Sequence, residues 1–79
     1  MTVQITKTAI KDLKKIAIPT RERILNAINK LPSGDVKRLR GYLTYYRLRV
    51  GNYRIIYSVE NDTIIVFAVL PRGEAYKHI

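Results

Sequence analysis

Apolar and polar residues follow two different periods along this chain. Residues 2–6 alternate between polar and apolar side chains, which is typical of a short strand. Between residues 7 and 17 the apolar positions recur at helical spacing, and lysines occupy the opposite face. A second helical stripe follows Pro19 and ends near Leu31, with Thr20 as its candidate N-cap. We therefore expect a strand and then two antiparallel helices joined by a short turn, because the residue before a proline avoids the helical conformation.

The second half of the chain predicts an antiparallel sheet. Runs rich in β-branched and aromatic residues indicate three strands, at residues 43–50, 53–59 and 63–70. Two turn signals separate these strands, Gly51-Asn52 and Asn61-Asp62. Residues 35–41 are expected to form a basic connector between the helices and the sheet. The order of elements predicts an α+β domain with an N-terminal strand, an αα-hairpin packed on one face, and a twisted, mostly antiparallel sheet.

Two-residue loops also determine which residues share a face of the sheet. Tyr57 is expected to face Val66, and Ile55 to face Ala68, on the side that the helices cover. The opposite side is also apolar, and its expected members are Ile56, Ile65, Phe67 and Val69. A sheet that is apolar on both faces is normally covered on both faces. We therefore expect either the C-terminal tail or a partner chain to cover the second face.

Length and composition narrow the class of protein. Residues 1–79 are expected to form a single small domain. The chain has no cysteine, which fits a cytoplasmic location. No apolar run approaches the roughly 20 residues that span a membrane, so no membrane partner is expected. One histidine, no cysteine and scattered carboxylates give no metal-binding pattern, and no cofactor motif is present.

Positive charge is concentrated in the middle of the chain. Fifteen Lys and Arg residues against six Asp and Glu residues give a formal net charge of +9. No acidic residue occurs between Asp35 and Glu60, and this window contains Lys37, Arg38, Arg40, Arg47, Arg49 and Arg54. A field of one sign attracts polyanions. Nucleic acid is therefore the first candidate partner, an acidic protein is the second, and a merely solvated basic surface is the remaining alternative.

Three of these arginines are expected to converge on one face of the sheet. If Gly51-Asn52 is a two-residue loop, Arg49 faces Arg54, and Arg47 lies on the same side. Guanidinium groups this close repel one another unless an anion lies among them, and their planar geometry suits a phosphate. We therefore expect a phosphate site on this face.

Metal-free RNA cleavage is the chemistry that such a site suggests. It needs a group that accepts the proton of a 2′-hydroxyl, cations that stabilise the phosphorane, and an acid that protonates the leaving 5′-oxygen. Guanidinium groups, a phenol and an imidazole supply these functions. The candidate residues are Arg47, Arg49, Arg54, Arg72, Tyr76 and His78.

The order of elements and these residues together resemble the RelE/ParE superfamily of bacterial type II toxins. The resemblance covers nearly the whole chain, and its clearest pieces are the 37–41 connector, the 46–57 hairpin, and the tail with Arg72 and Tyr76. Similarity to the RelE branch implies an mRNA interferase, which is a metal-independent endoribonuclease that cleaves translated mRNA in the ribosomal A site. It also implies contact with 16S rRNA and an acidic antitoxin that wraps the toxin in a hetero-oligomer.

The resemblance also assigns roles to matching residues. Arg47, Arg49 and Arg54 match positions that hold the phosphate, and Arg72 matches a position that stabilises charge or assists the leaving group. Tyr76 matches a tyrosine that stacks on the substrate base or accepts a proton. Further expected site residues are His78, which matches a terminal histidine of some relatives, and Lys37, Arg38 and Arg40, which are expected to contact RNA.

One departure from the RelE pattern changes the expected mechanism. The best-studied pattern has lysines where this chain has Arg47 and Arg49, and arginine essentially never loses its proton in proteins. The role of proton acceptor therefore moves to Tyr76 or His78, or the rate enhancement is mainly electrostatic. ParE-like relatives share the fold but inhibit DNA gyrase by binding, and this is the alternative function. A plain RNA-binding module is a third.

Overall fold

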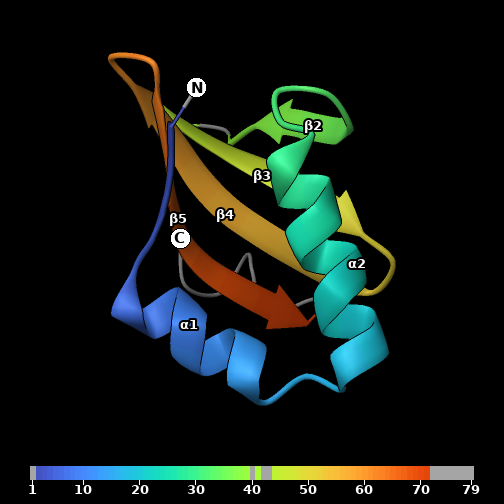
Figure 1. The fold of residues 1–79 in the computed structure, drawn as a ribbon. Helices are drawn as coiled ribbons and strands as arrows, with labels where there is room; N and C mark the ends of the chain where they lie inside the picture. The colour runs from blue at the N-terminus through green and yellow to red at the C-terminus, as the bar shows by residue number, and fades with distance from the viewer. Residues whose placement is uncertain (1, 40, 42–43, 72–79) are drawn as a thin grey trace.

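The computed structural model describes residues 2–39, 41 and 44–71. The elements in chain order are β1 (Thr2–Ile5), α1 (Lys7–Lys14), α2 (Ile18–Asn29), β2 (Asp35–Arg38), β3 (Tyr45–Val50), β4 (Tyr53–Glu60) and β5 (Thr63–Pro71). They form one sheet with the strand order β1-β5-β4-β3-β2, in which β1 is parallel to β5 and the other neighbours are antiparallel. Both helices lie on the same face of this sheet (Figure 1). The predicted α+β class is confirmed.

The helices begin where local hydrogen bonding and proline allow. The side chain of Thr6 caps α1 by accepting a hydrogen bond from the backbone N–H of Ala9 at 3.2 Å. The second helix begins at Ile18 with Ala17 at the cap position and no side-chain bond, whereas the sequence predicts Thr20 as the N-cap. The predicted start is too late because Pro19 lies in the first turn, where its missing N–H has no helical partner to lose.

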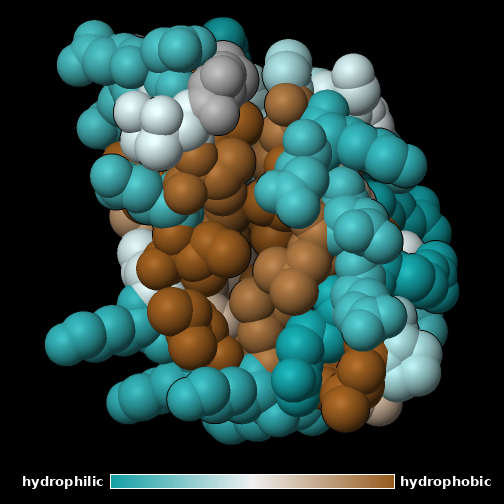
Figure 2. Space-filling view, in the orientation of Figure 1, coloured by the Kyte–Doolittle hydropathy of each residue, from teal (hydrophilic) through white to brown (hydrophobic). Residues whose placement is uncertain are grey.

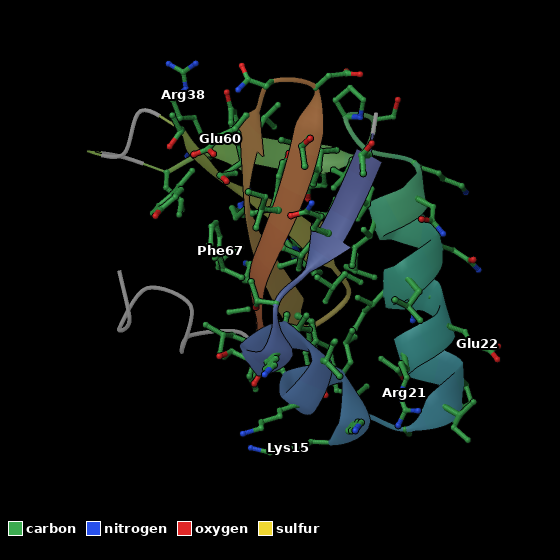
Figure 3. All side chains as sticks on the ribbon, turned by 60° about the vertical axis from the view of Figure 1, so that its left-hand side comes forward. Lys15, Arg21, Glu22, Arg38, Glu60 and Phe67 are labelled. Atoms are coloured by element: carbon green, nitrogen blue, oxygen red, sulfur yellow. The ribbon has the colours of Figure 1, made fainter. Side chains whose placement is uncertain are left out.

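The side chain of Arg21 links the start of α2 to the end of α1. Figures 1 and 3 show the helices meeting at a steep angle rather than lying along one another, so the expectation that they are antiparallel is wrong. Arg21 donates from Nε to the Leu13 carbonyl at 2.9 Å and from Nη2 to the Ile16 carbonyl at 3.0 Å, and Nη2 also reaches the Lys14 carbonyl at 3.3 Å. These carbonyls lie at or just beyond the end of α1, where helical partners run out, although that of Leu13 also accepts a bond from the Ile16 N–H at 3.1 Å.

The basic connector is partly a strand. Asp35–Arg38 pairs with β3 in antiparallel register, so the sheet gains a fifth strand at its edge. The expectation of a connector over residues 35–41 is therefore wrong for its first half. The reason is that Val36 is the single apolar residue in this strand, and a charged edge strand needs little hydrophobic alternation.

The two hairpin turns behave as predicted. Gly51 has a φ of 57°, and the adjoining strands pair Val50 with Tyr53 and Arg49 with Arg54. In the second turn Asn61 and Asp62 have φ angles of 47° and 64°, which is the left-handed pair that a type I′ turn requires. The register of β3 on β4 is thereby the register that the sequence predicts.

A β-bulge changes the predicted register of β5. Tyr57 pairs with Val66 as expected, but Ile55 pairs with Val69 instead of Ala68, because β5 contains one extra residue at this point. Val69 therefore lies in the helix-side core and Ala68 lies on the opposite face, which reverses both predictions. Phe67 is the extra residue, and apolar residues continue on both sides of it, so the alternation of the sequence gives no sign of the bulge.

The main core lies between the helices and the sheet. Its buried residues include Ile24 and Ile28 from α2 and Leu48, Ile55 and Val66 from the sheet. A smaller cluster on the opposite face contains Leu39 and Ile56, and the apolar residues packed against it are Tyr45, Ala68 and Leu70. Apolar side chains are still visible at the surface between the two helices (Figure 2). No helix in the described part of the chain is long and apolar enough to cross a membrane.

Candidate nucleic-acid interface

The three arginines of the hairpin lie on one face of the sheet, as predicted. Arg49 on β3 and Arg54 on β4 are cross-strand partners, and Arg47 belongs to the next pair on the same face. Leu48 and Ile55 point to the other face, where they are buried in the helix-side core. Arg47, Arg49 and Arg54 together form the arginine site. It lies on the face of the sheet that the helices do not cover.

Arg54 is the most unusual member of the arginine site. It is only 7% exposed, and its Nε has no hydrogen-bond partner among the described residues. Its Nη1 donates to the Tyr53 carbonyl, but at a long distance of 3.5 Å. A buried cation without a carboxylate partner is costly. An anionic ligand on this face would offset that cost.

Arg47 has an acidic partner that the sequence analysis did not identify. Its Nη1 donates to the carboxylate Oδ1 of Asp35 at 3.2 Å and to the Asp35 backbone carbonyl at 3.0 Å. The Arg47 side chain is 15% exposed, while that of Asp35 is 58% exposed. Asp35 thus binds Nη1 of the Arg47 guanidinium, while the buried Nε of Arg47 has no partner among the described residues. This pairing depends on β2, the edge strand that the sequence did not predict.

The predicted RNA contacts in β2 are divided between the two faces. Lys37 is the cross-strand partner of Arg47 and therefore joins the face of the arginine site. Arg38 is opposite Tyr46, with its guanidinium carbon 5.7 Å from the centre of that ring and its Nη2 3.5 Å from the hydroxyl. Tyr46 in turn stacks on Tyr57 at 5.4 Å between ring centres. Arg38 is therefore grouped with helix-side aromatic residues, apart from the arginine site.

Four predicted site residues cannot be placed. Arg40, Arg72, Tyr76 and His78 lie outside the described residues. Their assignment to RNA binding or catalysis remains a prediction from the sequence.

An aromatic pair borders the arginine site and was missed by the sequence analysis. Tyr45 on β3 and Phe67 at the bulge of β5 lie with ring centres 5.5 Å apart and ring planes inclined by 57°. Both are half-buried. Ser58, the cross-strand partner of Tyr45, is fully buried, and its hydroxyl has no partner among the described residues. The signal in the sequence was Tyr45 itself, two residues before Arg47 on the same strand.

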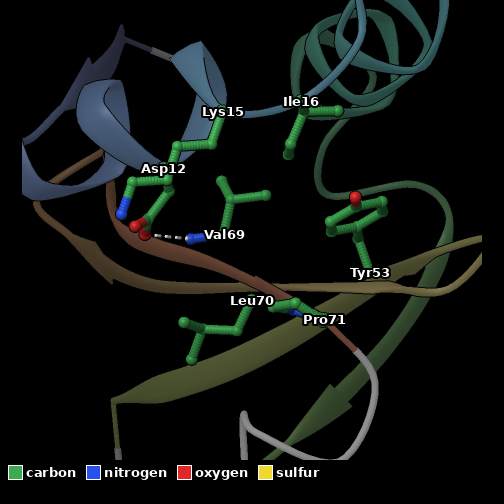
Figure 4. Close-up of a pocket in the computed structure, with 7 residues that line it drawn as sticks. All are labelled: Asp12, Lys15, Ile16, Tyr53, Val69, Leu70 and Pro71. Carbon is green, nitrogen blue, oxygen red and sulfur yellow. Dashed lines mark hydrogen bonds between the residues drawn. The ribbon is translucent and has the colours of Figure 1, made fainter.

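A separate pocket lies between α1 and the end of β5 (Figure 4). Its volume is about 260 Å³, and it is lined by Asp12, Lys15, Ile16, Tyr53, Val69, Leu70 and Pro71. Asp12 accepts a hydrogen bond from the backbone N–H of Val69 at 3.0 Å. Val69 lies beyond Val66, the last residue of β5 that pairs with β1, so β1 no longer covers this edge of β5. None of the three clustered arginines lines this pocket, so it is distinct from the arginine site.

Tyr57 is unsuited to accept a proton at neutral pH. Burial, and to a lesser extent the neighbouring Tyr46, raise the pKa of the Tyr57 hydroxyl from 10.0 to about 12. Its ring belongs to the helix-side core, as the sequence predicts. Among the described residues, no group of His, Cys, Asp and Glu is arranged to hold a metal ion.

Comparisons with known proteins agree with this architecture. The family model of ParE toxins of type II toxin–antitoxin systems matches residues 3–76. Toxin RelE3 of Methanocaldococcus jannaschii is 42% identical, over 99% of this chain and 98% of the relative. The putative toxin RelE1 of the same organism is 34% identical, over 96% and 94%.

Solved structures show the same fold. The crystal structure of a RelB–RelE antitoxin–toxin complex from Methanococcus jannaschii matches with a TM-score of 0.81 and 38% identity, over 96% of this chain and 98% of that chain. An archaeal RelE–RelB complex from Pyrococcus horikoshii matches with a TM-score of 0.76 and 30% identity, over 91% and 94%. The fold and the matched family define the class of this protein, a toxin of a type II toxin–antitoxin system. Within that class, the chain belongs to the RelE family.

Proposed function

We propose that this protein is a ribosome-dependent endoribonuclease that cleaves translated mRNA in the A site. The observation that carries the proposal is the arginine site, in which the buried Arg54 has no carboxylate partner among the described residues. Arginine forks suit the two free oxygens of a phosphodiester. Membership of the RelE family supports the assignment to RNA cleavage. A ribosome-dependent activity takes place in the cytoplasm, which is the location we propose.

In the proposed reaction, arginines bind the phosphate and other residues transfer the protons. The 2′-oxygen attacks phosphorus and forms a new O–P bond, while the bond between phosphorus and the 5′-oxygen breaks. Arg47 and Arg54 hold the phosphate and stabilise the charge that develops on it. Neither arginine accepts the 2′-hydroxyl proton, since a guanidinium stays protonated. Tyr76 or His78 is proposed for that step and for returning a proton to the leaving oxygen, which leaves a 2′,3′-cyclic phosphate.

A second candidate function is inhibition of DNA gyrase by binding. It is favoured by the name of the matched family model, which is that of ParE toxins. It requires no nuclease site, so it gives no reason for a buried guanidinium without a partner. Growth arrest with intact mRNA and accumulated DNA breaks would support this function against the first.

We also propose that the toxin is neutralised by an acidic antitoxin. Two similar structures are complexes with a RelB antitoxin. This chain carries a net charge of +9, which favours an acidic partner, and apolar side chains remain at the surface between its helices (Figure 2). A segment that folds on binding is suited to cover such a surface. Coexpression with the neighbouring gene product should suppress toxicity, and failure to do so would contradict this partner.

One experiment distinguishes the two functions. The chain is induced in a host cell, mRNA ends are mapped, and plasmid supercoiling is measured in the same cultures. We expect new mRNA ends at A-site codons and unchanged supercoiling. Arg54→Ala should abolish both growth arrest and the new ends. Arg23→Ala is the matched control, because Arg23 is an exposed arginine on α2, and it should retain both effects.

A further inference from the structure

The aromatic pair Tyr45–Phe67 is formed by two strands that are not neighbours. In the sheet, β4 lies between β3 and β5, so the two rings meet across β4. Ser58 on β4 is the cross-strand partner of Tyr45, and its side chain is small and fully buried. The bulge at Phe67 places an extra side chain at this position. These features bring two aromatic rings to a surface that a regular pair of strands would not provide.

The aromatic pair lies beside the arginine site. Tyr45 is two residues from Arg47 on the same strand and face, which corresponds to about 7 Å along the strand. Phe67 projects from the side of the sheet away from the helices (Figure 3). Ile56, the cross-strand partner of Arg47, is buried in the apolar cluster against which Tyr45 packs. A ligand whose phosphate is bound by Arg47 and Arg54 would therefore meet an aromatic surface next to the phosphate.

We propose that Tyr45 and Phe67 bind a nucleobase of single-stranded RNA adjacent to the phosphate held by Arg47 and Arg54. This inference rests on the proposed function, which supplies RNA as the ligand. Aromatic side chains next to a cationic groove are the usual means of binding single strands, because every base has a face that stacks on a ring. A paired base offers no free face, so the site selects unpaired RNA. Stacking recognises no hydrogen-bonding pattern, so binding tolerates different bases and favours the larger purines.

The test uses binding to short RNA and requires no cleavage. Fluorescence anisotropy measures the affinity of the purified chain for a single-stranded RNA oligonucleotide and for the same oligonucleotide with its central bases removed. We expect Phe67→Leu and Tyr45→Leu each to weaken binding of the intact oligonucleotide about tenfold, with little effect on the abasic one. Phe67→Tyr retains an aromatic ring, so this variant should keep most of the difference in affinity between the intact and the abasic oligonucleotide. Thermal unfolding of each variant confirms that it is folded.

The outcomes separate this inference from the proposed function. If Phe67→Leu and Tyr45→Leu weaken both oligonucleotides equally, or neither, while Arg54→Ala weakens both, the aromatic pair does not bind a base and this inference is overturned. If the two leucine variants weaken binding of the intact oligonucleotide alone but no mRNA is cut in cells, the base site is supported and the nuclease function is contradicted. A duplex bound as tightly as the single strand would also overturn the inference.

Discussion

In the proposed function, individual residues of the arginine site bind an anion at the expense of stability. Arg54 is buried, and no carboxylate among the described residues pairs with it. Arg49 is its direct cross-strand partner, and like charges in that position repel. A residue selected only for stability would be apolar here, like the neighbouring Ile56. A bound anionic ligand would explain why a guanidinium occupies this buried position.

This explanation predicts opposite effects of one substitution on stability and activity. Arg54→Met keeps an apolar stem and removes the buried charge, so we expect the free energy of unfolding to rise by about 1 kcal/mol. Removal of a group that stabilises transition-state charge should lower cleavage by a factor of about 10²–10³. Urea unfolding and a cleavage assay measure the two effects. Arg23→Met, on an exposed position of α2, should change stability by less than about 0.5 kcal/mol. A destabilised Arg54→Met variant would mean that Arg54 is structural.

Tyr57 gives the fold a pH dependence in the alkaline range. Because burial raises the pKa of its hydroxyl from the usual 10.0 to about 12 in the folded chain, folding favours the neutral form. The stability that this provides is complete below pH 10 and is lost as the pH rises toward 12. We expect the free energy of unfolding to fall less steeply between pH 10 and 12 in Tyr57→Phe than in the parent. Identical slopes would contradict the buried, neutral phenol.

At the scale of elements, local patterns predicted the existence of the helices and turns, while the departures within the sheet depend on contacts between strands. The apolar stripe that includes Ile24 and Ile28 identified α2, and the Gly51-Asn52 turn gave the register of the arginine hairpin. β2 was missed because its four residues are paired at the edge of the sheet and hardly buried. The bulge at Phe67 was missed because apolar residues continue on both sides of it.

The features of the candidate site also fall into those that local spacing predicts and those that depend on contacts between strands. Arg47, Arg49 and Arg54 were predicted together because one hairpin carries all three. The partnership of Asp35 with Arg47 depends on β2, and the contact of Tyr45 with Phe67 depends on strands separated by β4, so neither follows from local spacing. Sequence alone therefore located the cations but not the groups that position them or border them.

The corner between the helices is an element-scale feature that can be tested. Arg21→Ala removes the bonds from its guanidinium to the carbonyls of Leu13, Lys14 and Ile16. Since these carbonyls lie at or just beyond the end of a helix, we expect the free energy of unfolding to fall by about 2 kcal/mol. Arg23→Ala removes an arginine two residues away that is exposed, and it should have little effect. Equal effects of the two substitutions in urea unfolding would show that Arg21 does not secure the corner.

At the scale of the whole molecule, the two faces of the sheet differ in character, and we propose a different partner for each. The helices and their core occupy one side of the sheet, and the arginine site occupies the other. Apolar residues visible between the helices form the surface that we propose for the antitoxin. The net charge of +9 would favour both of the proposed partners, an acidic antitoxin and RNA.

Binding of RNA should therefore depend strongly on salt. If each of the three clustered arginines forms one ion pair with the RNA backbone, the logarithm of the association constant for single-stranded RNA should fall against the logarithm of salt concentration with a slope of about −2. Arg54→Ala should make the slope shallower by about 0.7. Anisotropy titrations at several salt concentrations measure both slopes. A slope that Arg54→Ala leaves unchanged would place the phosphate contacts elsewhere.

The most direct measurement of the central claim is cleavage on purified ribosomes. Ribosomes are programmed with an mRNA that carries either a ribose or a single 2′-deoxyribose at the cleaved nucleotide in the A site, and the products are mapped by primer extension. We expect the parent chain to cut the ribose-containing message at that nucleotide, Arg54→Ala not to cut it, and neither chain to cut the 2′-deoxy message. Cleavage of the 2′-deoxy message, or equal cleavage by Arg54→Ala, would contradict phosphate binding by the arginine site and attack by the 2′-hydroxyl.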